Sequence, residues 1–336
     1  MISLGIESTA HTFGIGIITD KGKILVDEKS IYKPPLGCGI HPRKAGQHHT
    51  ENASITLKNA LKKSKVKIRD VDIISFSQGP GLPNCLQVGA SIARHLSLKY
   101  KKPLVGVNHC IAHIEIGKLA AKCKDPVVVY CSGGNTQIIA YVDGKYRIFG
   151  ETEDIPLGNA FDVLARVFNL EMPGGPKIDA LAKKGKWVDL PYVVKGMDQS
   201  FTGIVTECKR KYKQGVKKED ICYSFVETVF SMLTEVTERA LAHTDKSEVL
   251  LTGGVAAAPR LIEMMKIMCK EREGKCYVVP KNYSGDNGTM IAWTGILVFN
   301  SYQKTAIQKT AIQKTAIQNS GIIKNWRTDE VDITWL

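Results

Sequence analysis

One pattern occurs twice in this chain of 336 residues and limits the folds that it can adopt. In residues 2–30 an apolar strand, "ISLGIE", runs into a loop of small polar residues, and two further strands follow. Residues 126–151 repeat the order of strand, Gly/Ser/Thr loop, strand, Asp-Gly turn and strand. A repeat of this size predicts two related α/β domains that face each other, and not a solenoid.

Apolar residues at helical spacing predict helices in the rest of the chain. The expected helical ranges are 48–65, 85–100, 109–122, 219–244 and 288–302, and residues 248–271 read as a strand, a Gly-Gly loop and a helix. We expect lobe I to take in residues 1–116 and those from about 300 to 336, and lobe II to take in residues 117–299.

The composition is that of an ordinary globular chain, with 43% hydrophobic residues and a mean hydropathy of −0.10. No apolar run approaches the ~20 residues of a membrane span. The start, "MISLGIESTA", lacks the basic and apolar regions of a signal peptide. The nine cysteines include no Cys-x-x-Cys pair, so we expect free thiols and a cytoplasmic location.

The net charge is +13, and the lysines are clustered. The clusters lie at 61–69, 99–102, 209–218 and from Lys304 onward. Lysine-rich solvated faces would explain them, and so would a polyanionic partner such as a nucleic acid. Charge alone does not choose between these explanations.

Three glycine- or serine-rich loops follow strands, at 7–12, 131–136 and 252–257, and "GGP" at 174–176 is a fourth candidate. Converging backbone N–H groups in such loops bind phosphate, although any one loop could be a plain strand-to-helix turn. Together they predict a nucleotide held between the two lobes. The candidate phosphate-loop residues of the first and third loops are Ser8, Thr9, His11, Gly253 and Gly254.

A histidine pair in "NHCIAH" indicates a metal site, because residues i and i+4 of a helix share a face. His109 and His113 could grip one ion, and Asp286 of "SGDNGTMIA" could add a carboxylate. The alternatives are a chance spacing and an Asp-Asn-Gly turn that only caps a helix. A zinc peptidase needs a glutamate where Cys110 stands.

A series of motifs along nearly the whole chain resembles the universal tRNA N6-adenosine threonylcarbamoyltransferases, the catalytic subunit of the KEOPS complex. In order, these are "GIESTAHTFGIGI", "SQGPGLPNCLQVGASIAR", "GVNHCIAHIE", "YCSGGNTQ", "GNAFDVLAR", "PGGPKID", "KGMDQSFTGI", "LLTGGVAA" and "DNGTMIA". "TAHT" and "RTDEVDITW" are similar to the archaeal and eukaryotic branch.

The resemblance implies an actin/Hsp70/sugar-kinase-like fold, with two ribonuclease-H-like lobes and a nucleotide cleft between them. It implies a metal bound by His109, His113, Asp286 and the phenol oxygen of Tyr130. The ion would be iron or zinc, with magnesium as a further candidate. The implied nucleotide-binding residues are Tyr130, Cys131, Ser132, Gly133, Gly134, Asp162, Gly175 and Asp179.

The implied reaction is an acyl transfer. L-Threonylcarbamoyl-AMP donates its threonylcarbamoyl group to N6 of the adenosine 3′ of the anticodon in ANN-decoding tRNAs, and AMP leaves. Because the donor is already activated, no side-chain nucleophile is required. The reaction requires instead that the substrates are oriented and that developing charge is stabilised. ATP, AMP or the adenylate is then the expected bound nucleotide, and tRNA accounts for the positive charge.

Several positions depart from the family pattern. Ala258 stands where the family has the asparagine of "GGVAANxRL", so a side-chain contact to the nucleoside is lost there. Gln87 replaces an arginine, Asp179 a glutamate and Lys44 an acid, and Ser284-Gly285 stand where Cys-Thr or a similar pair is common. The four implied metal ligands are retained, which favours an active but divergent enzyme over a non-catalytic tRNA-binding scaffold. An ATPase or kinase of the same superfamily is the other alternative, but it gives the histidine pair no role.

The resemblance also implies partners, namely a small kinase-like protein, a dimerising subunit and a further small regulator, and it implies no membrane. The three "KTAIQ" copies from 304 to 318 have a five-residue period that suits neither a helix nor a strand. They favour a linker near the surface, with a tRNA-contacting arm as the alternative.

Overall fold

The computed structural model describes residues 1–34, 39–304 and 320–336. Apart from Lys304, the KTAIQ copies lie outside the described residues, as does Cys38. The chain divides into two compact units, the first of residues 1–119 and 285–336 and the second of residues 120–284. The second unit therefore ends before the expected boundary at 299, because the helix that starts at Gly288 packs on the sheet of the first unit.

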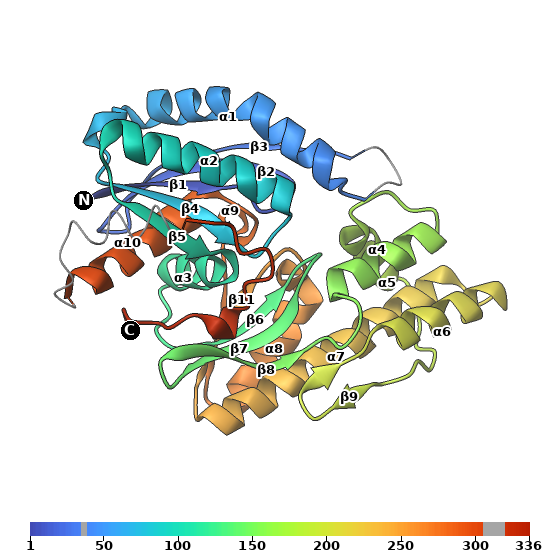
Figure 1. Ribbon diagram of the computed structural model, residues 1–336. Helices are drawn as coiled ribbons and strands as arrows, with labels where there is room; N and C mark the ends of the chain where they lie inside the picture. Colours follow the sequence, from blue (N-terminus) through green and yellow to red (C-terminus); the bar gives the residue numbers. More distant parts are fainter. Residues whose placement is uncertain (35–38, 305–319) are drawn as a thin grey trace. The chain divides into compact units, whose positions relative to one another are not determined.

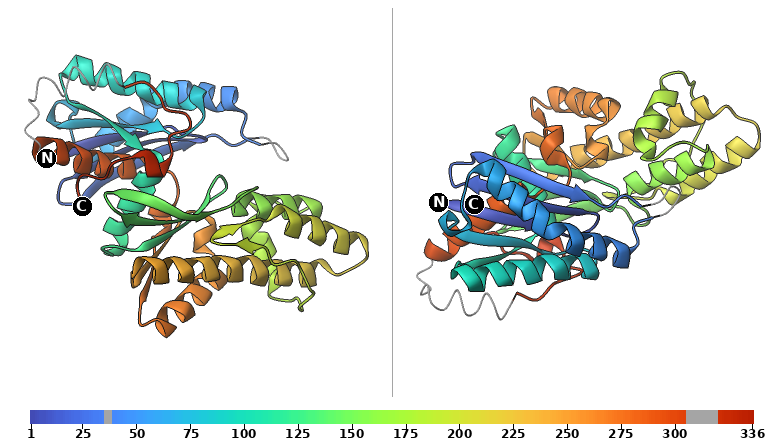
Figure 2. Two further views of the ribbon diagram at one scale, coloured as in Figure 1. Left: turned by 60° about the horizontal axis from the view of Figure 1, so that its bottom comes forward. Right: turned by 90° about the horizontal axis from the view of Figure 1, so that it is seen from above.

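The first unit is built on a five-stranded sheet in the order β3-β2-β1-β4-β5. Strands β1, β2 and β3 form an antiparallel meander, whereas β4 and β5 run parallel to β1. Helices α1 and α2 cover one face and α10 covers the other (Figures 1 and 2). The elements are β1 (Ile2–Glu7), β2 (Thr12–Thr19), β3 (Ile24–Ile31), α1 (Pro42–Ser64), β4 (Ile73–Gly79), α2 (Pro83–Tyr100), β5 (Leu104–Asn108), α3 (His109–Ala121) and α10 (Gly288–Lys304), with short 3-10 turns at Ile68–Asp70 and Thr328–Glu330.

Two facing glycines fix the position of α10 on this sheet. Gly5 of β1 pairs in register with Gly16 of β2. A Cβ atom on Gly16 would lie 2.1 Å from the backbone nitrogen of Thr289, and one on Gly5 would lie 2.3 Å from that of Ala292. Only glycine permits so close an approach of two backbones. The residues just before α10, including Asp286, are therefore held beside the end of β1.

The second unit repeats the same topology. Its sheet has the order β12-β11-β6-β7-β8, with an antiparallel meander of three strands and two parallel strands beyond the first of them. The predicted duplication of a strand–loop–strand–turn–strand unit is thus present at the level of complete sheets. The strands are β6 (Val127–Cys131), β7 (Thr136–Val142), β8 (Lys145–Glu151), β11 (Glu248–Thr252) and β12 (Lys275–Val278), with a small hairpin of β9 (Val194–Lys195) and β10 (Asp198–Gln199).

Each unit has its own apolar core. In the second unit the 27-residue helix α7 crosses the sheet and also packs against α5, α6 and α8. Its buried rings, such as Phe225 and Phe230, contact Phe161 of α4. The helices of this unit are α4 (Leu157–Val167), α5 (Gly174–Ala182), α6 (Thr202–Lys213), α7 (Lys218–Thr244), α8 (Pro259–Glu271) and α9 (Lys281–Ser284), with a 3-10 turn at Val255–Ala257.

The expected helices are present, with some differences at their ends. Helix α1 starts six residues before the expected residue 48, because Pro42 occupies its first turn, where proline's missing N–H is not needed. The eight cysteines in the described ranges are free thiols, as expected. Within those ranges, no helix combines the length and apolar character that crossing a bilayer requires.

Candidate metal centre and nucleotide-binding loops

The histidine pair lies at the start of α3, directly after β5. Asn108, the last residue of the strand, caps this helix, since its side-chain oxygen accepts hydrogen bonds from the N–H groups of Cys110 (3.0 Å) and Ile111 (3.2 Å). The cap fixes where the helix begins and hence which face the two histidines share. The rings of His109 and His113 meet edge to face, with centroids 4.7 Å apart, and both are buried.

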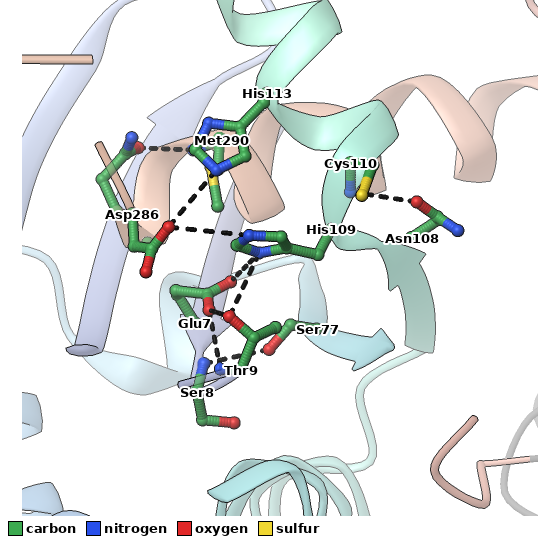
Figure 3. A network of polar contacts seen from close by, with 12 residues as sticks. Glu7, Ser8, Thr9, Ser77, Asn108, His109, Cys110, His113, Asp286 and Met290 are labelled. Carbon is green, nitrogen blue, oxygen red and sulfur yellow. Dashed lines mark hydrogen bonds and ion pairs between the residues drawn. The ribbon is translucent and has the colours of Figure 1, made fainter. Parts of the chain in front are cut away.

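Asp286 joins the two histidines from the far end of the chain (Figure 3). Its Oδ1 lies 3.3 Å from Nε2 of His113 and 3.5 Å from Nε2 of His109. The three ligand atoms lie within 4.8 Å of one another. The next residue, Asn287, caps α10 by accepting from the Met290 N–H (2.9 Å), so the carboxylate is carried on a fixed turn.

A second carboxylate, Glu7, supports His109 from behind. Glu7 is fully buried at the end of β1, and its Oε2 lies 3.0 Å from Nδ1 of His109. Its Oε1 accepts the backbone N–H of Thr9 at 2.7 Å and the Thr9 hydroxyl at 2.5 Å. With Nδ1–H donated to Glu7, Nε2 of His109 is left with its lone pair toward Asp286 and His113. A carboxylate behind a histidine is the usual outer partner of a metal-bound imidazole.

The sequence does not mark Glu7 as part of the metal centre. In the sequence, Glu7 is notable only as an acidic residue at the end of an otherwise apolar strand. The pairing with His109 depends on β1 and α3 meeting in space, which the local pattern does not reveal. His11 also approaches the centre, with Nδ1 at 3.9 Å from Oδ2 of Asp286.

The electrostatics of the centre favour a bound positive charge. Burial opposes the charged form of His109, but the carboxylates of Glu7 and Asp286 outweigh it and raise the pKa of His109 to about 9. Burial and the neighbouring His109 lower the pKa of His113. Burial would raise the pKa of Asp286, yet the hydrogen bond from His113 and the charge of His109 hold it well below its usual range. A metal cation would take the place of the proton that His109 holds.

The donor set fits a transition-metal ion. Two ligands at 2.0–2.1 Å from a tetrahedral ion are separated by about 3.4 Å, and the two Asp286–histidine distances lie close to this value. Two imidazoles and one carboxylate suit zinc and iron better than magnesium, which prefers oxygen ligands.

Tyr130, the proposed fourth ligand, belongs to the second unit. It lies on β6, one residue before the strand ends, and is buried between Gln137 of β7 and Thr252 of β11 in the register of the sheet.

Two buried cysteines lie near the candidate residues. Burial raises the pKa of the Cys131 thiol, next to Tyr130, to about 12, and it also raises the pKa of the Cys110 thiol, next to His109, to about 12. Both thiols are therefore protonated at neutral pH and are poor nucleophiles.

The loop after β6 exposes two of its glycines. A Cβ atom added to Gly133 or Gly134 would meet nothing within 4 Å, and the same holds for Gly254 after β11. The Ser132 side chain organises the loop, since its hydroxyl accepts the N–H groups of Gly134 (3.2 Å) and Asn135 (3.0 Å). The Ser132 N–H is itself bonded to the carbonyl of Asn135, so phosphate binding by these amides requires the loop to rearrange.

Gly253 connects the loops after β6 and β11. It has a φ of +96°, and a Cβ atom there would lie 2.2 Å from the carbonyl oxygen of Cys131. Both features require glycine. The two loops therefore lie side by side at the carboxyl ends of neighbouring parallel strands, which is where α/β sheets commonly bind ligands.

The other predicted nucleotide-binding residues lie on or directly before helices of the same unit. Asp162 of α4 accepts the N–H of Gly174 at 2.8 Å and so caps α5. Next to this cap, Gly175 leaves open space, and Asp179 is half-buried with its pKa raised by burial. Ala258 is the N-cap residue of α8, where an asparagine side chain could cap the helix and alanine cannot.

In the first predicted phosphate loop, at residues 7–12, two backbone N–H groups already donate to nearby side chains. The N–H of Ser8 is bonded to the hydroxyl of Ser77 at 2.9 Å, and that of Thr9 to Glu7. Both residues are buried. These two N–H groups are therefore engaged within the loop's own surroundings, and the one of Thr9 helps to fix Glu7 behind His109.

The sequence is similar to known proteins over most of its length. A sequence model of the family described as "TsaD: tRNA N6-adenosine threonylcarbamoyltransferase" matches residues 23–293. A Thermococcus sibiricus protein described as tRNA N6-adenosine threonylcarbamoyltransferase is 53% identical over 337 residues, which cover 100% of both chains. A Methanocaldococcus jannaschii protein, "Probable bifunctional tRNA threonylcarbamoyladenosine biosynthesis protein", is 52% identical over 100% of this chain; the chain spans only 61% of that relative's length.

Solved structures of low sequence identity share the fold. HypF from T. kodakarensis matches 93% of this chain and 49% of its own at a TM-score of 0.61 and 14% identity. The activator of 2-hydroxyisocaproyl-CoA dehydratase from Clostridium difficile matches 92% of this chain and 99% of its own at a TM-score of 0.52 and 10% identity. With the two matching sheets, these likenesses confirm the predicted actin/Hsp70/sugar-kinase-like class with two ribonuclease-H-like lobes.

Proposed function

Because the chain belongs to the tRNA N6-adenosine threonylcarbamoyltransferases, a family of tRNA-modifying transferases, we propose the following reaction for it. It transfers the threonylcarbamoyl group of L-threonylcarbamoyl-AMP to N6 of the adenosine 3′ of the anticodon in ANN-decoding tRNAs, and AMP is released. The observation that supports this most strongly is the convergence of His109, His113 and Asp286, with Glu7 behind His109.

The chemistry is an addition to a carbonyl followed by loss of a good leaving group. The N6 amine of adenosine attacks the carbamoyl carbon and forms a C–N bond. The bond from that carbon to the phosphate oxygen then breaks, AMP leaves with the electron pair, and the amine proton goes to solvent. The buried Cys110 and Cys131 thiols, protonated at neutral pH, supply no nucleophile, and the activated donor needs none.

The metal centre would be completed by Tyr130 through its phenol oxygen. A bound iron or zinc ion, with magnesium as the weaker candidate, would supply Lewis acidity and a fixed anchor for the acyl-phosphate. Glu7 keeps Nδ1 of His109 protonated and therefore keeps Nε2 available as a ligand. His113 and Asp286 are held by the caps of α3 and α10.

The adenylate would be held by residues of the second unit. The open space above Gly133, Gly134 and Gly254 leaves room for a ligand to approach the backbone. Asp162 and the start of α5 would hold the ribose and base, with Gly175 and Asp179 on the same side. Packing and backbone contacts would replace the missing side-chain contact at Ala258.

The proposal includes partners and a location. We infer that the chain acts on tRNA in the cytoplasm together with a small kinase-like protein and a dimerising subunit, as a KEOPS catalytic subunit. The relative from M. jannaschii is described as bifunctional, and 39% of its length lies outside the match.

A reconstituted modification assay tests the proposal. Unmodified tRNA is incubated with threonine, bicarbonate, ATP, an adenylate-forming enzyme, the partner subunits and this chain, and its nucleosides are then measured by mass spectrometry. We expect N6-threonylcarbamoyladenosine with the wild type, and its loss with a chelator or with His113→Gln. His95→Gln changes an exposed histidine of the same unit and serves as the matched control.

The same mixtures distinguish the alternative functions. ATP hydrolysis by this chain without tRNA modification would indicate an ATPase or kinase. Modification that persists in His113→Gln, with the fold intact by circular dichroism, would indicate a non-catalytic scaffold whose metal centre has no part in the transfer.

A further inference from the structure

The second unit carries a concentrated basic surface, which we call the basic tip. It comprises the exposed or half-exposed side chains of two segments, 183–187 and 209–218, neither of which contains an acidic residue. The first segment directly follows α5, and the second covers the end of α6 and the start of α7 (Figure 1). Its cationic residues are Lys183, Lys184, Lys186, Lys209, Arg210, Lys211, Lys213, Lys217 and Lys218.

Backbone contacts join the first segment and Val188 to the first two turns of α7, directly after the second segment. The N–H of Lys186 is bonded to the carboxylate of Asp220 at 2.7 Å, and the N–H of Val188 to the hydroxyl of Ser224 at 2.7 Å. Gly185 packs so closely on Glu219 that a Cβ atom would lie 2.1 Å from its carbonyl oxygen. The segment 183–187 is therefore held beside the start of α7, which contains the end of the segment 209–218.

The charge of the tip is not part of a general excess in the unit. Residues 183–220 contain ten basic and five acidic residues, whereas the rest of the second unit contains fourteen basic and sixteen acidic ones. All of the net positive charge of the unit is thus carried by this region. Of the nine tip cations, Arg210 and Lys211 pair with Glu207, and no ion pair joins the other seven to an acidic side chain in the described part of the chain.

Helix stabilisation explains only part of this pattern. Cations near the carboxyl end of α6, such as Lys213, are favoured by the helix dipole. Lys217 and Lys218 occupy the N-cap and first position of α7, which is the end where a cation is disfavoured. Crowding of like charges is also unfavourable for the folded chain. A bound polyanion would offset both unfavourable features, namely the cations at the start of α7 and the crowding of like charges.

Two exposed aromatic rings accompany the cations. Trp187 is 53% exposed, and its indole N–H is bonded to Asp189 at 2.9 Å. Tyr212 is 40% exposed, and its ring meets Phe168 edge to face with centroids 4.8 Å apart. These contacts hold the rings in place, and both side chains remain partly exposed. Rings beside cations are the usual means of stacking unpaired bases in RNA recognition.

We propose that the basic tip binds RNA, with its lysines on backbone phosphates and Trp187 and Tyr212 on unpaired bases. The inference rests on the proposed function, which supplies tRNA as that RNA. It adds a binding surface on the second unit that is distinct from the metal centre and from the loops after β6 and β11. Positive charge together with exposed aromatic rings favours RNA over an acidic protein, which has no bases to stack.

Equilibrium binding of unmodified tRNA to the full chain at several salt concentrations tests the proposal. The test variant is Lys184→Gln/Lys213→Gln/Lys217→Gln, and its control is Lys266→Gln/Lys270→Gln/Lys275→Gln, which removes three exposed lysines from α8 and β12 of the same unit. Each lost phosphate contact on unpaired RNA weakens binding about fourfold near 0.15 M salt and makes the salt slope shallower by about 0.7. We therefore expect roughly a 50-fold loss and a slope change of about 2 for the test variant, and wild-type binding for the control.

Two further variants separate phosphate contact from stacking and from misfolding. Trp187→Ala should weaken binding by about tenfold without changing the salt slope, because stacking releases no counterions. Lys184→Arg/Lys213→Arg/Lys217→Arg should restore wild-type binding, since it retains the charge. A test variant that binds tRNA with wild-type affinity and slope would overturn the proposal, as would a control that loses as much.

The outcomes also keep this inference apart from the proposed function. A chain that binds tRNA through the tip but yields no modified nucleoside would refute the proposed function only. A chain that modifies tRNA while the test variant binds as tightly as the wild type would refute the tip only. Unchanged tRNA binding with lost binding to poly-glutamate would assign the tip to an acidic protein instead.

Discussion

Replacing Glu7 by glutamine tests the metal centre with almost no change in side-chain shape. The carboxylate is fully buried and accepts on both oxygens, from the N–H and hydroxyl of Thr9 on one side and from Nδ1 of His109 on the other. A glutamine at position 7 has one acceptor oxygen and one NH₂ donor in the same places. It therefore cannot accept from Thr9 and from His109 at once.

The expected loss of metal affinity or of stability follows from the two orientations that the glutamine amide can take. If its oxygen faces Thr9, its NH₂ group faces Nδ1 of His109, which must then carry a lone pair, and the proton moves to Nε2, where the metal would bind. If its oxygen faces His109, the N–H of Thr9 is left opposite a donor in a buried place, which costs about 1–3 kcal/mol of stability. Changes to such outer partners lower metal affinity by about 10–100-fold, or about 1.4–2.7 kcal/mol.

The assay is a competition for Zn²⁺ or Fe²⁺ between the full chain and a chromophoric chelator, with thermal unfolding as a check on folding. Glu115→Gln is the matched control, because Glu115 is another buried carboxylate of the first unit, bonded to the indole of Trp335 at 3.2 Å. We expect Glu7→Gln to lose affinity and Glu115→Gln to retain it. Equal metal affinity in Glu7→Gln and the wild type would refute the role given to Glu7.

Three further predictions concern stability. Gly16→Ala places a Cβ atom 2.1 Å from the Thr289 nitrogen and should lower the free energy of unfolding by about 1–3 kcal/mol or more, measured by denaturant titration. Asp162→Ala removes the acceptor of the Gly174 N–H and should cost about 0.5–2 kcal/mol by the same measurement; an unchanged midpoint would contradict the capping role. The pKa of Asp154 is lowered because, although burial acts against it, three backbone N–H groups donate to its carboxylate. The ionised Asp154 carboxylate therefore stabilises the folded chain at pH values above its pKa in the unfolded chain, near 3.9. This stabilisation is lost as the pH falls through the pKa of Asp154 in the folded chain. Asp154→Asn should lower the stability at pH 7 and weaken its loss between pH 5 and 2, and an unaltered acid unfolding curve would count against this assignment.

The sequence predicts those features of the molecule that depend on short-range patterns. The repeated strand–loop–strand order indicated the duplicated sheets, because alternation and turn residues are local signals. The shared face of His109 and His113 follows from helical geometry alone. Asp286 was a candidate because of its own turn motif, but its approach to the histidines requires the close packing of α10 on Gly5 and Gly16.

The features that the sequence does not predict depend on contacts between distant segments. Glu7 and His109 are 102 residues apart, and no periodic pattern links them. The same is true of the segment 183–187, which reaches the first turn of α7 through the hydrogen bond from Lys186 to Asp220. The cluster at 209–218 was visible in the sequence as charge, but its enlargement by a second segment was not.

The two loops that follow the first strand of each unit show why composition alone cannot assign a phosphate site. Both are short, polar and placed at the same point of the same topology. In the first unit the N–H groups of Ser8 and Thr9 are bonded to Ser77 and Glu7, and the second of these bonds helps to fix a carboxylate behind His109. In the second unit Gly133 and Gly134 face open space, although Ser132 engages part of the loop. What separates a supporting loop from a candidate binding loop is therefore the destination of each N–H group. That destination is set by tertiary neighbours, so loops at the same point of one topology can differ in which N–H groups they leave open to a ligand.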